Sequence, residues 1–399
     1  MVSSLKMKCI ISGLMLTLFL LYSCTTYRQD LSTVHCPELL QTHSEFPNQE
    51  KMKSLLDQLT ATSVPGVAIA AYSKENGWWQ YATGLAKIED QTPMQVCHLH
   101  YLQSIAKTYM SIAILKLQEE ERLNIEDSFL PYLPEHLQQY LPFAEGISIR
   151  MLLGHTSGLP EYNADPAYVS DLIQHPDRDF QVEDYLSYLQ KKSLRFTPGT
   201  KYRYTNTNYV LLALIADQIT GDHSQYISDI IFKPLALENT YYRNEPNYLQ
   251  YPEIYNAYWD RFSNGILENV SRWQRQNVSD LIGDDGIVAT PKDAVQFLIG
   301  LMEGHLLRPS SLELMKQGFK GEDGKVIYGL GLDFADLGGQ IGLGHSGGGL
   351  GAGCQLYYFP EQELYCFIGI NLGTVTDSPI HTEALPIVQQ LYELLLESN

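Results

Sequence analysis

Hydrophobic residues near the start of the chain's body follow first a helical and then a strand-like pattern. Between Gln49 and Thr62 apolar side chains recur three or four positions apart, which predicts an amphipathic helix. Two compact β-prone runs follow, Val67 to Tyr72 and Trp78 to Gly84, and Asn76-Gly77 between them is a strong hairpin-turn signal. The body is therefore expected to open with a helix and a β-hairpin.

The same patterns predict a helical middle and a second β-rich stretch near the end. Ser104 to Glu121 has an apolar face wide enough to be buried nearly all round, and Tyr209 to Thr220 is the clearest helix of the middle. A closing amphipathic helix is predicted over Glu383–Glu397. Before it we expect four short strands separated by Gly- or Pro-rich turns, at Tyr328–Phe334, Ile341–His345, Gln355–Phe359 and Leu364–Ile370.

This order of elements predicts an α+β fold. The N-terminal hairpin and the C-terminal strands would form one antiparallel β-sheet flanked by the terminal helices, with a mostly helical lobe inserted over roughly residues 125–285. A cleft between sheet and lobe is where we expect a site. The sequence is divided into a leader, residues 1–23, a polar tether, residues 24–45, and one domain, residues 46–399.

The leader has its own composition. Lys6 and Lys8 precede the almost wholly apolar stretch Cys9–Tyr22, which is too short to span a bilayer comfortably. A serine and then Cys24 follow. This order resembles the lipobox of bacterial lipoproteins, which implies a signal peptide over residues 1–23 and lipidation of Cys24; a plain secretory signal is the alternative. The expected location is the bacterial cell envelope, periplasmic or surface-exposed, with membrane contact through the lipid anchor only.

Composition and charge exclude some kinds of partner. Of the 399 residues, 44% are hydrophobic and 18% charged, which is ordinary globular composition. The net charge of −19 becomes −21 when residues 1–23, with two lysines and no acids, are removed. A body this acidic, without a basic run, is not expected to bind nucleic acid or anionic lipid head groups.

The cysteines and histidines give no metal-binding pattern. No cysteine pair has CxxC spacing, and His98 with His100 has no further ligand cluster, so we expect no metal and no cofactor. Cys354 and Cys366 lie on the two strands of a predicted hairpin but not opposite each other, which argues against a disulfide bond between them. Outside the leader and the expected lipid site, an exported protein has three possible pairings among its four cysteines, Cys36, Cys97, Cys354 and Cys366.

Ser104 and Lys107 form an SxxK motif at the start of a predicted helix. Residues three apart share one helix face, so the ammonium group can reach the hydroxyl. A free serine is a poor nucleophile and needs a neighbour to accept its proton, and burial lowers the pKa of a lysine toward that role. The motif alone has little specificity, because Ser3 to Lys6 in the leader also fits it.

Tyr204 and Asn206 form a YxN motif. A tyrosine that shares its proton with neighbouring cations can act as a general base, and Asn206 could orient Lys107 and donate to a substrate carbonyl. Tyr242 and Asn244 fit the same pattern. The turn before Tyr204 and the predicted buried helix after Asn206 favour the first pair.

His345, Ser346 and Gly347 form an HxG motif in a predicted strand. A strand beside the nucleophile can hydrogen-bond an extended acyl substrate along its backbone. Gly347 and Gly348 would let that substrate approach closely. We expect the N–H groups of Ser104 and Gly348 to be the two oxyanion donors.

SxxK, YxN about a hundred residues on, and HxG in a late strand together resemble the serine β-lactamase-related superfamily. The resemblance is closest to the branch of class C β-lactamases, DD-carboxypeptidases and related esterases, and runs from about Lys51 to Leu396. It implies a β-lactamase/transpeptidase-like fold, Ser104 as nucleophile, Lys107 and Tyr204 as its catalytic partners, and no cofactor. It includes three further segments, 64–68, 155–160 and 283–290.

Some residues depart from the family pattern or adjoin its motifs. His345 stands where many β-lactamases carry lysine, and an imidazole would hold a substrate carboxylate less firmly. Gln103 stands where the family more often has alanine or glycine; it either narrows the oxyanion region or only changes its packing, and we expect the second. Asp284 and Asp285 are expected to shape a turn beside the cleft, and His155 to tie down the turn that follows it.

These features predict a monomeric envelope serine hydrolase that forms an acyl-enzyme with a small peptide, ester or β-lactam. A D-alanyl-D-alanine peptide is the first expectation, because the envelope supplies it; a small ester or D-amino-acid amide, and a β-lactam, are alternatives. A noncatalytic penicillin- or peptidoglycan-binding lipoprotein is an alternative of another class. The intact SxxK, YxN and HxG motifs argue against it.

Overall fold

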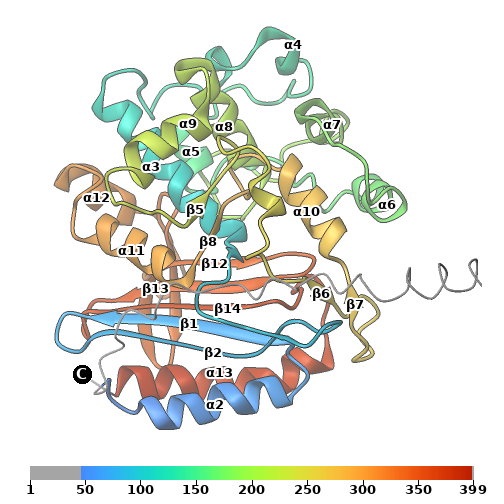
Figure 1. The fold of residues 1–399 in the computed structure, drawn as a ribbon. Coiled ribbons are helices and arrows are strands. Elements are labelled where there is room, and N and C mark those ends of the chain that lie inside the picture. The colour runs from blue at the N-terminus through green and yellow to red at the C-terminus, as the bar shows by residue number, and fades with distance from the viewer. Residues whose placement is uncertain (1–45, 398–399) are drawn as a thin grey trace, which may run out of the picture. The chain divides into compact units, whose positions relative to one another are not determined.

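A single antiparallel sheet is the centre of the structure, a computed structural model that describes residues 46–397. The predicted signal peptide, the tether and Cys24 lie outside the described residues. The order of the nine strands is β3-β2-β1-β14-β13-β12-β11-β10-β9 (Figure 1). Their bounds are β1 Gly66–Ser73, β2 Gly77–Lys87, β3 Thr92–Pro93, β9 Phe319–Lys320, β10 Val326–Tyr328, β11 Asp333–Leu337, β12 Gln340–Gly348, β13 Gly353–Phe359 and β14 Leu364–Ile370.

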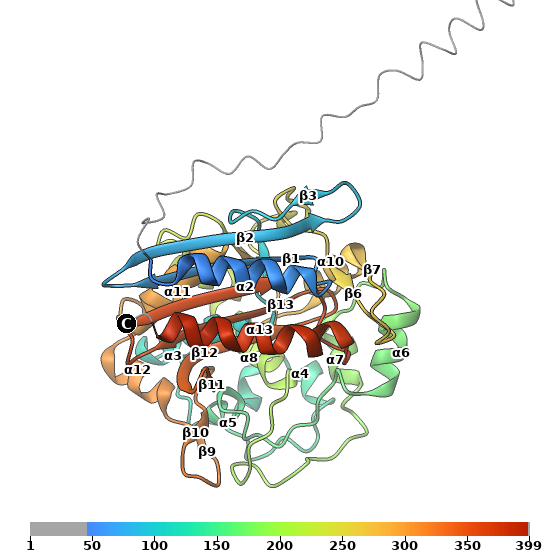
Figure 2. The same cartoon turned by 90° about the horizontal axis from the view of Figure 1, so that it is seen from below.

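The first and last helices cover one face of this sheet. Helices α2 (Gln49–Ala61) and α13 (Pro379–Leu396) lie side by side there (Figure 2). Both terminal segments of the domain meet in the sheet as well, because β1 pairs with β14 over seven residues, Val67 opposite Ile370. The regularly spaced apolar residues of α2 are the buried ones: Met52, Leu55, Leu56 and Leu59.

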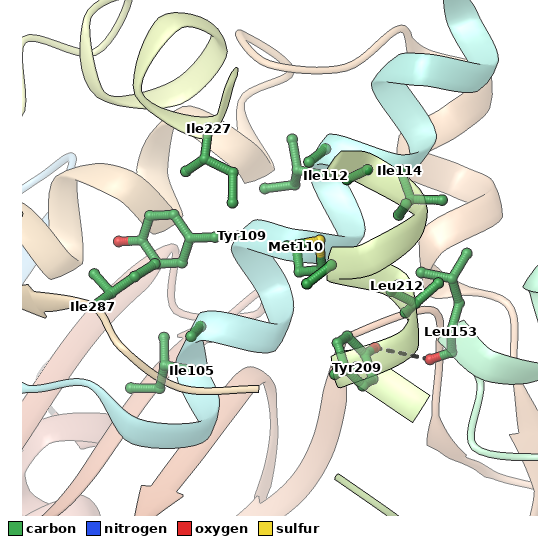
Figure 3. Close-up of a cluster of buried hydrophobic side chains, with 14 of the residues drawn as sticks. Ile105, Tyr109, Met110, Ile112, Ile114, Leu153, Tyr209, Leu212, Ile227 and Ile287 are labelled. Carbon is green, nitrogen blue, oxygen red and sulfur yellow. Dashed lines mark hydrogen bonds between the residues drawn. The ribbon is translucent and has the colours of Figure 1, made fainter. Parts of the chain in front are cut away.

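The other face carries the helical part of the domain. Helix α3 (Ala106–Glu119) is buried nearly all round and packs against α8 (Thr207–Thr220), so that its apolar side chains form the main core (Figure 3). Tyr209 donates a hydrogen bond to the carbonyl of Leu153 across this core, at 2.9 Å. A short helix, η1 (Gln103–Ile105), leads into α3 and packs against β12.

The remaining elements lie mostly in the helical part. The helices are η2 Leu130–Tyr132, α4 Glu135–Gln138, α5 Ile149–Leu153, α6 Pro166–Gln174, α7 Val182–Ser187, α9 His223–Ile227, η3 Ser228–Phe232, η4 Tyr248–Gln250, α10 Ser271–Asp280, α11 Pro291–Met302 and α12 Pro309–Lys316. The strands are β4 His100–Tyr101, β5 Thr240–Tyr241, β6 Tyr258–Trp259, β7 Glu268–Asn269 and β8 Val288–Ala289. The α+β class, with a large antiparallel sheet and flanking helices, is confirmed.

One strand prediction needs correction. The strand predicted over 328–334 is wrong, because β10 ends at Tyr328 and β11 begins at Asp333. Gly331 between them has a φ of 77°, and a Cβ atom there would collide with the side chain of Ser111 on α3, so the chain turns closely past that helix. Between residues 46 and 397, no helix has the length and apolarity needed to cross a membrane.

The cysteines of the described part differ in state. Cys354 and Cys366 are buried and free, as their register in the β13–β14 hairpin predicted. Cys97 is disulfide-bonded. Cys24 and Cys36 lie outside the described residues. Burial raises the pKa of both free thiols, so neither is a reactive thiolate.

Candidate active site

The serine and lysine of the SxxK motif are in direct contact. Lys107 Nζ donates hydrogen bonds to Ser104 Oγ at 3.0 Å and to the carbonyl oxygen of Asp284 at 2.9 Å. The lysine is fully buried, and this burial lowers its pKa, although three nearby carboxyl groups act in the opposite direction. A lysine in this state can give up its proton more easily than one in water, which a partner for a serine nucleophile requires.

Tyr204 stands beside this pair. Its ring centroid is 5.2 Å from Lys107 Nζ. Burial raises the pKa of Tyr204 well above its ordinary value, while the Ser104 side chain lowers it. The raised pKa keeps the phenol protonated, and its buried oxygen forms no hydrogen bond of ordinary geometry with any described residue, so it is free to hydrogen-bond a reacting group.

Asn206 has a different local role from the one expected. It is the residue before α8, and its backbone N–H donates to Glu161 Oε2 at 2.6 Å. The second hydrogen bond of Lys107 goes to the Asp284 carbonyl rather than to Asn206. The orienting contact for the lysine therefore comes from the segment 283–290, and a contact of the Asn206 amide with substrate stays a prediction.

His345 uses both ring nitrogens inside the protein. Nδ1 is 2.6 Å from the carbonyl oxygen of Ser346, which can only accept, so Nδ1 carries the proton. Nε2 then accepts from the hydroxyl of Tyr328 at 2.9 Å. Burial, with a smaller contribution from Lys107, lowers the pKa of His345 to about 3. The imidazole is therefore neutral and both its nitrogens are engaged within the protein, and a contact of His345 with substrate stays a prediction.

The HxG strand offers an open backbone edge. β12 pairs with β11 only as far as Gly344, opposite Asp333, and with β13 as far as Gly348. From residue 345 to 348 its other edge is therefore unpaired, near the point where η1 packs on the strand. This segment, with Ser346, Gly347 and Gly348, is available to pair with an extended substrate as predicted for it.

His155 packs against Tyr204 rather than only against its own turn. Its ring centroid lies 4.2 Å from that of Tyr204 and 4.8 Å from that of Tyr328. Its Nδ1 accepts from the backbone N–H of Thr205 at 3.3 Å. Burial holds its pKa well below the usual range. A neutral His155 thus holds the YxN segment in place through this hydrogen bond and through the packing of its ring on Tyr204.

Three carboxyl groups surround Lys107. Asp284 accepts from the hydroxyl of Tyr162 at 3.0 Å, and burial raises its pKa to about 6. Burial and the charge of Asp284 raise the pKa of Asp285 to about 7, and burial also raises that of Glu161. The aspartates, expected only to shape a turn, also act electrostatically on the lysine. The sequence analysis missed Glu161, because an isolated acid in a loop carries no motif.

The two buried aspartates predict a pH dependence of stability. Folded Asp284 and Asp285 keep protons up to about pH 6 and 7, above the ordinary aspartate value of 3.8. Their stabilising contribution is complete below pH 3.8 and is lost as the pH rises through the folded pKa values. Asp285→Asn removes the pH-dependent contribution of Asp285, so the melting temperature of this variant should fall less between pH 6.5 and 8 than that of the wild type.

That pH range separates the aspartates from the buried histidines. His98, with a pKa of about 4, and His100 and His345, with pKa values of about 3, are all lowered by burial. Histidines of this kind destabilise the fold only as the pH falls below their ordinary value of 6.5. Equal melting-temperature slopes for Asp285→Asn and wild type above pH 6.5 would contradict the assignment.

The competing YxN match and a nearby acid–histidine cluster are structural. The hydroxyl of Tyr242 is 2.9 Å from His223 Nε2 and accepts from the N–H of Gly283 at 3.1 Å, so this tyrosine belongs to the core. His223 Nδ1 bonds Asp217 at 2.8 Å, and Asp222 caps α9. Both ring nitrogens of the histidine are used, and the cluster ties α8 to α9.

Two curated proteins are similar to this chain over half of its length or more. "Penicillin-binding protein 4*" of Bacillus subtilis is 27% identical over 283 residues, 68% of this chain and 60% of that protein. "Protein flp" of Staphylococcus aureus is 26% identical over 203 residues, 50% of this chain and 39% of that protein. The chain therefore spans less than two thirds of the length of these relatives.

Several solved structures share the fold. A D-stereospecific amidohydrolase from Streptomyces sp. superposes with a TM-score of 0.73 at 23% identity, covering 86% of this chain and 98% of that one. D-amino acid amidase from Ochrobactrum anthropi SV3 gives 0.74 at 22% identity, covering 88% and 98%. An octameric penicillin-binding protein homologue from Pyrococcus abyssi gives 0.71 at 22%, covering 88% and 78%, so the fold also occurs in oligomers and a monomer stays a prediction here.

The family assignment rests on most of the domain. The Beta-lactamase family model matches residues 52–384, which contain the SxxK, YxN and HxG motifs. The chain therefore belongs to the beta-lactamase family.

Proposed function

We propose that this protein is an envelope serine hydrolase that forms an acyl-enzyme on Ser104 and prefers substrates with a free ammonium group and an uncharged amide or ester, such as D-amino-acid amides. One observation carries the choice of substrate. His345 is neutral and both its nitrogens are engaged, so it offers no cation for the carboxylate of a D-alanyl-D-alanine peptide.

The charges around the site support an ammonium-bearing substrate. Asp284, Asp285 and Glu161 all raise the pKa of Lys107, and Asp333 with Asp284 and Glu161 raises that of Tyr204. Several carboxyl groups thus act on the reacting groups. Above about pH 7, where Asp284 and Asp285 are ionised, such a field attracts a cationic substrate and repels a carboxylate.

In this mechanism Ser104 Oγ attacks the substrate carbonyl, and its proton passes to Lys107. The N–H groups of Ser104 and Gly348 stabilise the oxyanion. Tyr204 gives its proton to the leaving amine or alcohol and is reprotonated from Lys107. A water then attacks the ester on Ser104 and gives a proton to the Tyr204–Lys107 pair, which returns it to Ser104 Oγ as the bond between Oγ and the acyl carbon breaks.

The test compares substrates that differ in one charge. We expect D-alanine p-nitroanilide to be cleaved with a kcat/KM at least about tenfold above that of its N-acetyl analogue, a difference of about 1.4 kcal/mol. Glu161→Gln keeps an oxygen for the Asn206 N–H and should remove most of this preference. The matched control Glu135→Gln, an exposed acid on α4, should leave it unchanged.

A second candidate is a DD-carboxypeptidase, because similarity to penicillin-binding protein 4* covers 68% of this chain. A higher kcat/KM for N-acyl-D-alanyl-D-alanine than for the free-amine anilide would select this candidate. If neither the anilides, nor N-acyl-D-alanyl-D-alanine, nor a penicillin acylates Ser104, both candidate functions are wrong. We further propose that Cys24 anchors the enzyme in the envelope; this rests on the sequence of the leader and is tested by labelling wild type and Cys24→Ala with palmitate in cells.

A further inference from the structure

Gln103, directly before the candidate nucleophile, is held in an unfavourable state. Its φ of 51° lies in the left-handed region, which side chains other than glycine rarely adopt. The residue is only 2% exposed, and its amide nitrogen Nε2 is buried without a hydrogen-bond partner among the described residues. Strained backbone and an unpaired buried donor both cost free energy, and such outliers cluster at functional sites.

The side chain of Gln103 occupies space that two glycines leave empty. A Cβ atom on Gly347 would lie 2.8 Å from Gln103 Cβ. One on Gly349 would lie 2.5 Å from Gln103 Oε1 and 2.7 Å from Nε2. The glutamine therefore runs along the end of β12, in contact with both neighbours of Gly348.

We propose that Gln103 is a positioning residue for the oxyanion hole. Its backbone leads directly into Ser104, and its side chain packs on the residues at either side of Gly348. One residue thus links the two segments that carry the expected oxyanion donors. The inference rests on the proposed function, because it assumes an acyl-enzyme on Ser104 and an oxyanion between these two N–H groups.

The packing of the side chain, not its amide group, carries this role. Nε2 has no partner, so a methionine of similar length loses no hydrogen bond donated by this nitrogen. Oxyanion donors act by being fixed before charge develops, and loosening them weakens transition-state binding more than substrate binding. Loss of the side chain should therefore lower kcat with little change in KM.

The test uses the full-length protein and three substitutions. Gln103→Gly removes the side chain and relieves the left-handed backbone, so it should fold at least as well as wild type while kcat falls about ten- to a hundredfold. Gln103→Met should keep most of kcat. Affinity for a boronic acid analogue of the acyl group, whose tetrahedral adduct places an oxygen in the oxyanion hole, should fall in parallel with kcat/KM.

Gly349→Ala tests the same contact by changing the glycine instead of Gln103. Its methyl group displaces the Gln103 amide, so this substitution alone should lower kcat. In the Gln103→Gly background it should cost nothing further, because the methyl enters space already vacated. Gly321→Ala, in the β9–β10 hairpin, is the control and should leave kcat unchanged.

Unchanged kcat and boronate affinity in Gln103→Gly and Gly349→Ala would overturn the inference, whatever their melting temperatures. So would strictly additive losses in the double variant. The proposed function fails separately: hydrolysis that survives in Ser104→Ala ends both proposals. An inactive Ser104→Ala beside a fully active Gln103→Gly ends only this one.

Discussion

Replacement of Ser104 by alanine is expected to lower kcat by roughly four to six orders of magnitude, the range seen when a serine hydrolase loses its nucleophile. Without Oγ no acyl-enzyme can form, and only binding and the oxyanion donors remain. Stability should change little, because the half-buried Ser104 has one hydrogen bond, from Lys107 Nζ. Turnover of the preferred substrate and the intact mass after incubation with a penicillin measure both steps.

Ser111→Ala is the matched control for this substitution. Ser111 lies on the same helix, and its Oγ is 3.0 Å from the hydroxyl of Tyr209, away from the nucleophile. Losing that buried hydrogen bond should cost about 1 kcal/mol of unfolding free energy while turnover persists. Undiminished hydrolysis by Ser104→Ala, or a penicillin adduct of unchanged yield, would remove Ser104 from the mechanism.

Sequence patterns predicted those elements that are determined by residues close together in the chain. The strand Leu364–Ile370 has the predicted bounds, because a short apolar run between turns is a strand signal by itself. The split between β10 and β11 was missed, although Gly329 and Gly331 lie within the predicted strand and glycine there often marks a bend. The close passage of that turn over α3 is a tertiary contact that no local pattern contains.

The site shows the same difference between contacts set by neighbouring residues and contacts set by the tertiary fold. The contact between Ser104 and Lys107 follows from helical spacing, so the sequence predicts it. The partners of His345, by contrast, come from the end of β10 and from its own strand, and their effect on its charge depends on burial. Glu161 is brought to the YxN segment by a hydrogen bond across 45 residues. Sequence reasoning therefore identified the candidate reacting groups but not the charges that the fold places around them.

Replacement of Lys107 by methionine is expected to slow acylation by roughly three to four orders of magnitude, close to the effect of removing the nucleophile, because residues that act as a unit are not additive. Methionine keeps much of the buried volume but removes both hydrogen bonds of Nζ. The acylation rate from single-turnover kinetics measures the loss. Lys116→Met, on the same helix and paired with Glu119, is the control and should acylate normally.

The pH profile separates a proton acceptor from a merely structural cation. Burial lowers the pKa of Lys107, whereas Asp284, Asp285 and Glu161 raise it, and the net shift is downward. If neutral Lys107 accepts the proton of Ser104, wild-type kcat/KM rises with pH through that lowered pKa and then levels off. Lys107→Arg, which stays charged, should lose both the rise and the rate. A retained alkaline rise in Lys107→Met would instead make Tyr204 the base, with the lysine only tuning it.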